Sequence, residues 1–215
     1  IIAFVLIVQN LGYSVSGLIA GLGLGGLAVA LAAKDALGNL FGSVSIFVDR
    51  PFSIGDWIKT DKFEGVVEEI GFRSTRIRTF AKTLISVPNA HLASVYVENM
   101  SRMPKRRVYI NIGVTYSTTT AQMKQLLERI RKILREHPGV DQTFYLVHFD
   151  EFADSYLNIM VYYFTKTTDW DEYLTVREEI NLAIMKAVEE VGTEFAFPTR
   201  TVYLVGEQPQ VAAQK

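Results

Sequence analysis

The sequence predicts an α+β membrane protein that assembles from several copies, and three observations support this class. The first 33 of the 215 residues carry no charged side chain. The middle of the chain has short apolar runs separated by turn residues, which is typical of a small β domain. The last part alternates strand-like and helix-like periodicities, which is typical of a layered α+β domain.

Composition excludes several classes of protein. The net charge of −1 gives no overall attraction to nucleic acid. The absence of cysteine from these 215 residues excludes disulfides, thiolate metal sites and cysteine nucleophiles. The sequence begins with an apolar run rather than with Met or a basic segment, so we expect a fragment of a longer chain and no cleaved signal peptide.

Residues 13–34 are predicted to form a transmembrane helix. The stretch from Ser14 to Ala33 has 20 residues without a charge, and a helix of that length spans about 30 Å, the thickness of a bilayer core. Residues 1–12 would then be the end of a preceding transmembrane helix, with Gln9–Gly12 as the turn.

Small residues are placed regularly in this helix. Gly17, Gly21 and Gly25 repeat at every fourth position, and other small residues are interspersed, namely Gly23, Gly26, Ala28 and Ala30. Small residues let transmembrane helices approach closely. Such a helix needs other helices against much of its circumference, most simply copies of itself.

The string GLGLGG at Gly21–Gly26 also matches the G-x-G-x-x-G pattern of dinucleotide-binding loops. Asp49 follows Gly26 by 23 residues, near the position at which such folds place a ribose-binding acid. However, residues 14–17 interrupt the strand that should precede the loop, and the segment after Asp49 does not continue as a βαβ array. We therefore favour the membrane helix.

Leu24, Leu27 and Leu31 share one face of the helix because they are spaced by three and four residues. Periodicity alone leaves two interpretations open. The leucines pack against another helix, or symmetry brings Leu27 and Leu31 to a central axis as apolar rings, where they form a pore that closes by dewetting.

Residues 35–50 are predicted to form a second, amphipathic helix. Asp35 is a suitable N-cap, so Lys34-Asp35 marks the exit from the bilayer and a break in direction. An apolar stripe then follows at helical spacing, formed by Leu37, Leu40, Phe41, Val44, Phe47 and Val48. Pro51 ends the helix, and Lys34 and Arg50 favour a cytoplasmic exit by the positive-inside tendency.

Several motifs in order resemble the small-conductance mechanosensitive channel (MscS-type) family. They are GGLAVALAAKDALGNLFG, DRPFSIGDWI and ISVPNAHL. The later FADSYLNIMVYYFTKTT and FAFP resemble the YnaI-like branch of that family. The resemblance runs from about Ser14 to Leu204, which is nearly the whole chain.

The resemblance implies roles for residues of the first helix. The family has a pore-lining third transmembrane helix whose two leucine rings seal the closed pore, and these leucines correspond to Leu27 and Leu31. Gly23, Gly26 and Ala28 fall where small residues pack neighbouring subunits together. Gly42 matches a family glycine in the following helix.

The resemblance also implies an assembly, a location and an activity. We expect a homoheptamer in the bacterial cytoplasmic (inner) membrane, multi-pass, with its C-terminal domains in the cytoplasm as a hollow vestibule with side portals. We expect membrane lipids, permeating ions and small solutes as partners. The channel would open when membrane tension rises and so relieve osmotic stress.

One position departs from the family pattern. Better-studied members have a glycine where the pore helix kinks, and this sequence has Asp35 there, directly after Lys34. The N-capping interpretation of Asp35 preserves the kink without glycine. In an oligomer, Lys34 and Asp35 would also place rings of charge near the cytoplasmic mouth.

Residues 51–100 are predicted to form the small β domain, with strands over 54–60, 64–72, 75–79 and 84–87. The resemblance identifies it as an Sm-like barrel. Such a barrel next to basic residues also suggests RNA binding, with Arg102 and Lys105–Arg107 as the basic cluster. Stacking aromatics are missing there apart from Tyr109, so we favour a solvated linker and no nucleic-acid partner.

Residues 101–197 are predicted to form a ferredoxin-like α+β domain of order β-α-β-β-α. Its strands are expected at 108–114, 144–149 and 157–164, and its helices at 123–134 and 176–191. A C-terminal strand (201–204) and tail complete the last part, 198–215. The resemblance implies that seven copies of this strand close into a small barrel.

The sequence offers no active site, metal site or cofactor site. Alternation along a strand places His148 and Asp150 on one face and Glu151 on the other, and two ligands are too few for zinc. We therefore predict a protein that is not an enzyme. The two remaining hypotheses are a tension-gated channel with a hydrophobic gate at Leu27 and Leu31, and a membrane-anchored oligomeric scaffold or sensor without a conducting pore.

Overall fold

A computed structural model describes residues 15–200 of the chain. The predicted helix within residues 1–12 and the predicted strand 201–204 lie outside the described residues, so both stay predictions. Contacts divide the chain into two compact units, Ile1–Arg102 and Met103–Lys215.

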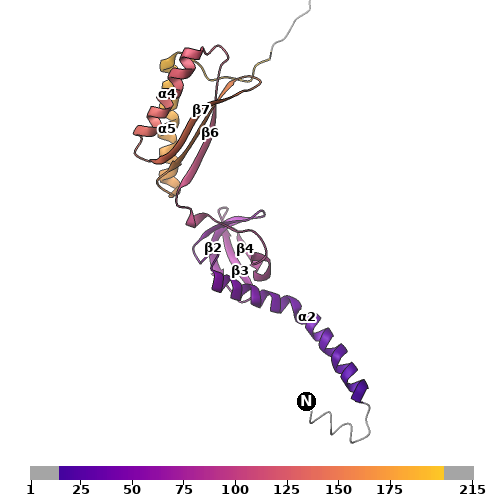
Figure 1. Ribbon diagram of the computed structural model, residues 1–215. Coiled ribbons are helices and arrows are strands. Elements are labelled where there is room, and N and C mark those ends of the chain that lie inside the picture. Colours follow the sequence, from indigo (N-terminus) through magenta and orange to yellow (C-terminus); the bar gives the residue numbers. More distant parts are fainter. Residues whose placement is uncertain (1–14, 201–215) are drawn as a thin grey trace, which may run out of the picture. The chain divides into compact units, whose positions relative to one another are not determined.

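The first unit contains one long helix and a small antiparallel sheet (Figure 1). Helix α2 spans Val15–Asp49. In residues 15–102 the sheet has five strands in the order β4-β3-β2-β1-β5, namely β1 (Trp57–Lys59), β2 (Glu64–Ile70), β3 (Ser74–Thr79), β4 (Leu84–Pro88) and β5 (Glu98–Asn99). A short helix α3 (Asn89–Leu92) follows β4, and a 3₁₀ turn (Met100–Arg102) follows β5.

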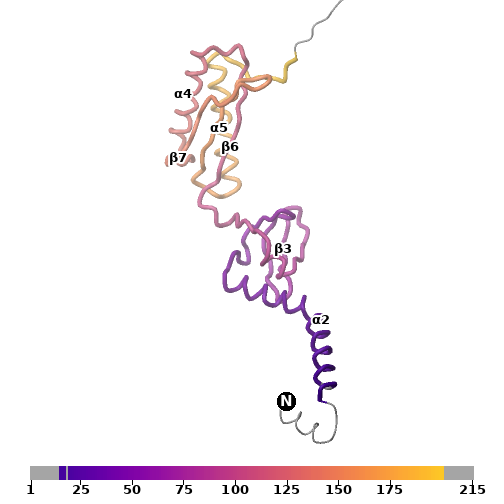
Figure 2. The backbone as a smooth tube through the Cα atoms, turned by 45° about the vertical axis from the view of Figure 1, so that its right-hand side comes forward, coloured from indigo at the N-terminus to yellow at the C-terminus, as the bar shows by residue number. Residues whose placement is uncertain are grey.

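The predicted start of a new helix at Asp35 is wrong, because α2 continues without interruption through Lys34 and Asp35. The alanine, leucine and lysine residues that flank Asp35 are good helix formers, so the helix can continue through this position. The ribbon of Figure 1 and the tube of Figure 2 both show a helix that bends but does not end. Asp35 therefore lies inside a helix and caps nothing.

The core of the first unit lies between the sheet and the second half of α2. Ile46 is the α2 residue that enters it, and the other members are Phe52, Ile58, Val67, Ile77, Val87 and Leu92. The first strand is shorter than predicted because Gly55 adopts a positive φ of 91° in a turn. That turn delays the strand until Trp57.

The second unit is a three-stranded antiparallel sheet with two helices, in the predicted order β-α-β-β-α. Its elements are β6 (Arg106–Val114), α4 (Thr120–Glu136), β7 (Val140–Phe152), β8 (Leu157–Thr165) and α5 (Trp170–Val191). Strand β8 lies in the middle of the sheet, between β6 and β7. This arrangement, together with that of the first unit, confirms the predicted α+β fold class.

Alternation along the strands determines the core of the second unit. Residues of β8 such as Ile159, Val161 and Tyr163 are buried under α4 and α5. The opposite face carries edge-to-face aromatic pairs in which Tyr162 contacts Tyr109, Phe144 and Phe164. Capping defines both helices: Thr119 and Gln122 form a capping box at α4, and Gly192 (φ 72°) ends α5.

Candidate pore helix and its contact with the β domain

Within residues 15–200, α2 is the one helix long and apolar enough to cross a membrane, as judged by length and composition. Its first half has no cover from the rest of the described chain, since Leu24, Leu27 and Leu31 are all more than half exposed. An uncovered helix that is apolar on all sides requires lipid, other helices or both. This half of α2 is therefore the candidate membrane segment.

The glycines of this segment have no packing role within their own chain. A Cβ atom added at Gly21, Gly23, Gly25 or Gly26 would meet nothing within 4 Å. At 100° per residue, Gly21 and Gly25 lie on one side of α2 and Gly23 and Gly26 on another. Gly17 and Ala28 lie on the side of Gly21. At Gly21, Gly23, Gly25 and Gly26 the described residues leave room for a neighbouring helix, and the packing role predicted for the small residues stays a prediction.

The predicted gate residues share a side that differs from both glycine sides. Leu27 and Leu31 are separated by about 40° around the helix axis, and Lys34 and Asp35 lie on either side of their direction. All four side chains are exposed in the single chain. The gate role stays a prediction, because a single copy does not form a pore.

Asn39 joins α2 to the β domain, and the sequence analysis missed this residue. Its side-chain Nδ2 donates to the carbonyl oxygen of Asp35 at 2.8 Å, and its Oδ1 accepts from the backbone N–H of Ala90 at 3.1 Å. One amide side chain therefore connects a turn of α2 to the first turn of α3.

Gly42 allows the same two helices to come into contact. A Cβ atom at this position would lie 2.6 Å from the backbone nitrogen of Ala90 and from the carbonyl carbon of Asn89. Gly38, one turn earlier, is less crowded, since its Cβ would lie 3.8 Å from the Ala90 Cβ. The Gly38-x-x-x-Gly42 spacing in ALGNLFG is the sequence signal that could have indicated a close helix contact here.

Asn89 anchors α3, on which α2 packs, to the interior of the β domain. Its side chain is fully buried, accepts a hydrogen bond from the Thr75 hydroxyl at 2.8 Å and donates to the Gly71 carbonyl at 2.7 Å. In the sequence, Asn89 belongs to the motif ISVPNAHL of the family resemblance. The structure shows that Asn89 begins α3, on which α2 packs.

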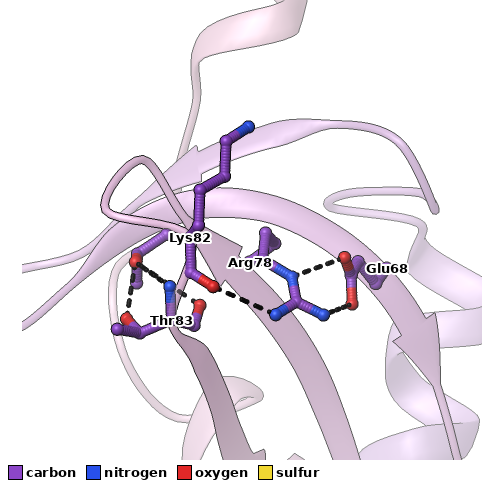
Figure 3. A network of polar contacts seen from close by, with 5 residues as sticks. Glu68, Arg78, Lys82 and Thr83 are labelled. Atoms are coloured by element: carbon purple, nitrogen blue, oxygen red, sulfur yellow. Dashed lines mark hydrogen bonds and ion pairs between the residues drawn. The ribbon is translucent and has the colours of Figure 1, made fainter.

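The sheet beneath this contact is braced by a polar network at the β3–β4 turn (Figure 3). Arg78 lies between Glu68 on β2 and the carbonyl oxygen of Lys82, with contacts of 2.7, 2.9 and 3.1 Å. The hydrogen bonds from Arg78 lower the pKa of the Glu68 carboxyl. The Lys82 ammonium points away from the network (Figure 3). The contacts of Arg78 join β2 to the β3–β4 turn, so we assign the network a role in holding the sheet together.

The prediction of a solvated linker for the basic cluster is correct for Arg102 and Arg107, which are exposed, and wrong for Lys105 and Arg106. Arg106 is 7% exposed, stacks on the rings of Trp170 and Tyr173 and donates from Nε to the Thr168 carbonyl at 3.1 Å. Lys105 forms an ion pair with Asp141. These residues therefore belong to the second unit, where they fix the entry of β6.

The pKa of the Asp141 carboxyl, in the second unit, is clearly lowered. Hydrogen bonds from Lys105 and from the backbone and side chain of Thr143 lower the pKa of its carboxyl from 3.8 to about 2. The acid is ionised at neutral pH and belongs to a structural ion pair.

The predicted facing of the residues around His148 is wrong. Strand β7 has a bulge between Phe149 and Glu151, and His148 pairs with Met160 while Glu151 pairs with Asn158. Met160 and Asn158 lie on the same face of β8, so His148 and Glu151 share a face. The extra residue of the bulge, Asp150, shifts the alternation by one. Within residues 15–200 no group of three or more His, Cys, Asp or Glu side chains is arranged to hold a metal.

Comparisons with known proteins cover almost the whole chain. The family model described as "Mechanosensitive ion channel, transmembrane helices 2/3" matches residues 1–34. The one described as "Mechanosensitive ion channel, beta-domain" matches residues 35–102, and "Mechanosensitive ion channel MscS, C-terminal" matches residues 108–195.

Curated relatives and solved structures agree with these matches. The small-conductance mechanosensitive channel MscMJ of Methanocaldococcus jannaschii is 46% identical over 91% of this chain and 56% of its own length. The low conductance mechanosensitive channel YnaI of Escherichia coli is 46% identical over 91% of this chain and 58% of its own. The crystal structure of Helicobacter pylori MscS in the closed state has a TM-score of 0.80 at 26% identity, covering 96% of this chain and 80% of that one.

A eukaryotic structure is similar as well. The cryo-EM structure of Arabidopsis thaliana MSL1 has a TM-score of 0.82 at 26% identity, covering 92% of this chain and 72% of that one. The chain spans about half the length of the curated relatives it matches.

Proposed function

The chain belongs to the MscS family of mechanosensitive ion channels, and from this membership we propose that several copies of it surround a pore that opens under membrane tension. One observation carries the proposal: the first half of α2 is apolar, and the rest of residues 15–200 covers neither its leucine side nor Gly21, Gly23, Gly25 and Gly26. Such a helix can pack against a copy of itself on each flank and present the leucines to a central axis.

The proposed gate consists of rings of Leu27 and Leu31. In the closed state the rings make the constriction narrow and apolar, so water leaves it and ions cannot pass. Tension favours whichever state occupies more membrane area. When the helices separate, the rings widen and water enters.

The contact between α2 and α3 limits which part of the helix moves. Asn39 and Gly42 hold the second half of α2 on the β domain. The movement that widens the pore therefore takes place in the half of the helix that precedes Asn39, which carries the gate and the charged pair Lys34 and Asp35.

The finer features of the assembly are part of the same proposal. It is a homoheptamer in the bacterial cytoplasmic membrane, multi-pass in the complete protein, with the β domain of the first unit and the whole second unit of each copy on the cytoplasmic side. Its ligands are membrane lipids around the helices and ions and small solutes in the pore. The family consists of ion channels, which are not enzymes, and no reaction is proposed.

A pressure ramp on excised patches tests the proposal, using the full-length protein in cells that lack other mechanosensitive channels. We expect stepwise currents at a reproducible tension. Leu31→Ser should lower the threshold tension severalfold more than Leu22→Ser, because a hydroxyl keeps the constriction wet only where it faces the axis. Leu22 is a matched control, since it is similarly exposed and lies about 180° from Leu31 around the helix.

Two outcomes would contradict the proposal. Silence from patches that contain the protein would favour a scaffold or sensor without a conducting pore. Equal thresholds for Leu31→Ser and Leu22→Ser, in channels that do conduct, would remove the leucine side of α2 as the gate.

A further inference from the structure

A continuous row of residues runs along α2 from the membrane half into the second half, which we call the α2 seam. Its members are spaced by three or four residues, so they remain on one side of the helix. In the first half they are small: Gly23, Gly26, Ala30 and Ala33. In the second half they are large and apolar: Leu37, Phe41, Val44 and Val48.

The second half of the seam is exposed although it lies outside the candidate membrane segment. Phe41 is 69% exposed and Val48 is 70% exposed. The contact with α3 through Asn39 and Gly42 uses the opposite side of the helix, so the β domain of the same chain does not cover the seam. In water this surface favours burial against another apolar surface.

A groove lies directly beside the seam, which we call the hairpin groove. It has a volume of about 480 Å³ and lies between α2 and the β2–β3 hairpin. Leu40, Val44 and Phe47 line it from α2, and Ile70, Gly71 and Phe72 line it from the hairpin. Phe72 is 85% exposed at its edge.

The seam and the groove together leave a large apolar surface exposed. Seven large apolar side chains contribute, each exposing roughly 100 Å², which amounts to roughly 700 Å². That area exceeds the largest apolar patch of a typical monomer. In a contact between two copies, one contributes its groove and the other its seam, so these side chains supply roughly 700 Å² of the about 1,600 Å² that both sides of a standard interface bury.

We propose that a second copy of this chain occupies the hairpin groove, with the Leu37, Phe41 and Val48 edge of its α2 seam inserted beside Phe72 of the first copy. Groove and edge lie side by side along the same stretch of α2, so they cannot meet within one chain. Contact of two different patches is the heterologous type that closes rings. The seam also continues the row of small residues in the membrane half, so one interface extends along the whole helix.

The two halves of the seam suit their surroundings. In lipid, helices associate by close approach, which small residues permit. Outside lipid, association is driven by burial of large apolar side chains. The change from small to large residues between Ala33 and Leu37 is therefore expected at a point where a helix–helix interface leaves the bilayer. The inference rests on the proposed function in one respect, the assembly of several copies around a pore.

Cysteine cross-linking of the full-length protein in native membranes tests the proposal. The 215 residues contain no cysteine, so Phe72→Cys can be combined in turn with Leu37→Cys, Phe41→Cys or Val48→Cys. Under mild oxidation we expect at least one pair to give a ladder of covalent oligomers on a denaturing gel. Each single variant should give no ladder, because a heterologous contact does not bring a residue next to its own copy.

A matched control pair and the native mass of the wild-type protein distinguish a failure of the groove assignment from a failure of the proposed assembly. Tyr96, also in the first unit, is 98% exposed and lies outside the groove, so Tyr96→Cys paired with Phe41→Cys should give no ladder. An oligomeric protein without a ladder from any Phe72 pair overturns the groove assignment but leaves the channel. Retention of lipid in the groove of that oligomer identifies the bilayer as the occupant instead. A monomeric protein overturns both proposals.

Discussion

Gly42 is a residue at which α2 and α3 of the β domain are in close contact. A Cβ atom there would lie 2.6 Å from two backbone atoms of α3, and backbone atoms cannot move aside as the end of a side chain can. The glycine is required by this contact and not by an unusual backbone conformation, since it lies inside a regular helix. The role of this residue is thus set by its neighbour and not by its own flexibility.

Gly42→Ala should therefore destabilise the full-length protein by about 1–3 kcal/mol, the usual cost of overpacking. Gly38→Ala is the matched control, because its Cβ would make an ordinary contact at 3.8 Å and alanine favours helix. Thermal denaturation in detergent measures both. Equal melting temperatures for the two variants would show that α2 and α3 do not touch as described.

Among the elements, α2 shows most clearly what could be predicted from the sequence. Its existence, apolar first half and amphipathic second half follow from periodicity and charge, which are local signals. Its continuity through Asp35 was not predicted, because aspartate after lysine is equally compatible with an N-cap and with a helix interior. The packing of the second half of α2 on α3 is what distinguishes a new helix at Asp35 from one continuous helix.

Among the strands and contacts, too, the features set by neighbouring residues could be predicted, and those set by residues distant in the sequence could not. The alternation of apolar and polar residues predicted the bounds of β6 and β8 to within two residues. The bulge at Asp150 and the first residues of β7 were not predicted, because they depend on pairing with β8. The roles of Asn39 and Asn89 depend on residues 51 and 14 positions away in the sequence, respectively. No local pattern contains that information.

Strand β7 begins at an ion pair whose dependence on pH follows from the lowered pKa of Asp141. A carboxyl with a depressed pKa in the folded state contributes stability above its unfolded value of 3.8, and this contribution is lost as the pH falls toward 2. The melting temperature of the wild type should thus exceed that of Asp141→Asn at pH 5, and the difference should shrink between about pH 4 and pH 2.

The control for this prediction is Asp150→Asn, which changes an exposed acid at the β7 bulge. The difference in melting temperature between the wild type and Asp150→Asn should not shrink in the same way between about pH 4 and pH 2. A gap between the wild type and Asp141→Asn that is constant across the acidic range would show that Lys105 and Thr143 do not hold the Asp141 carboxylate in solution.

At the scale of the whole assembly, each copy contributes Lys34 and Asp35 to the mouth of the proposed pore. Both flank the direction of Leu27 and Leu31 on α2. A ring of like charges attracts counter-ions and repels ions of its own sign. The balance of the two rings therefore sets the preference of the open channel between cations and anions.

Lys34→Gln should shift the permeability ratio toward cations, and Asp35→Asn should shift it toward anions, each by roughly two- to tenfold. The double variant should lie near the wild type. Reversal potentials in a salt gradient measure the ratios. Unchanged reversal potentials in both single variants would place these side chains away from the permeation path.

The attachment of α2 to α3 also has a torsional consequence. Because the helix is unbroken from Leu27 to Gly42, it transmits twist, and a helix whose far end is held by Asn39 and Gly42 is not free to roll about its own axis. In the proposed channel we therefore expect the leucines to withdraw from the axis by tilting or bending, while still pointing toward it. The wall of the conducting pore would then be made of the same side chains that seal the resting one.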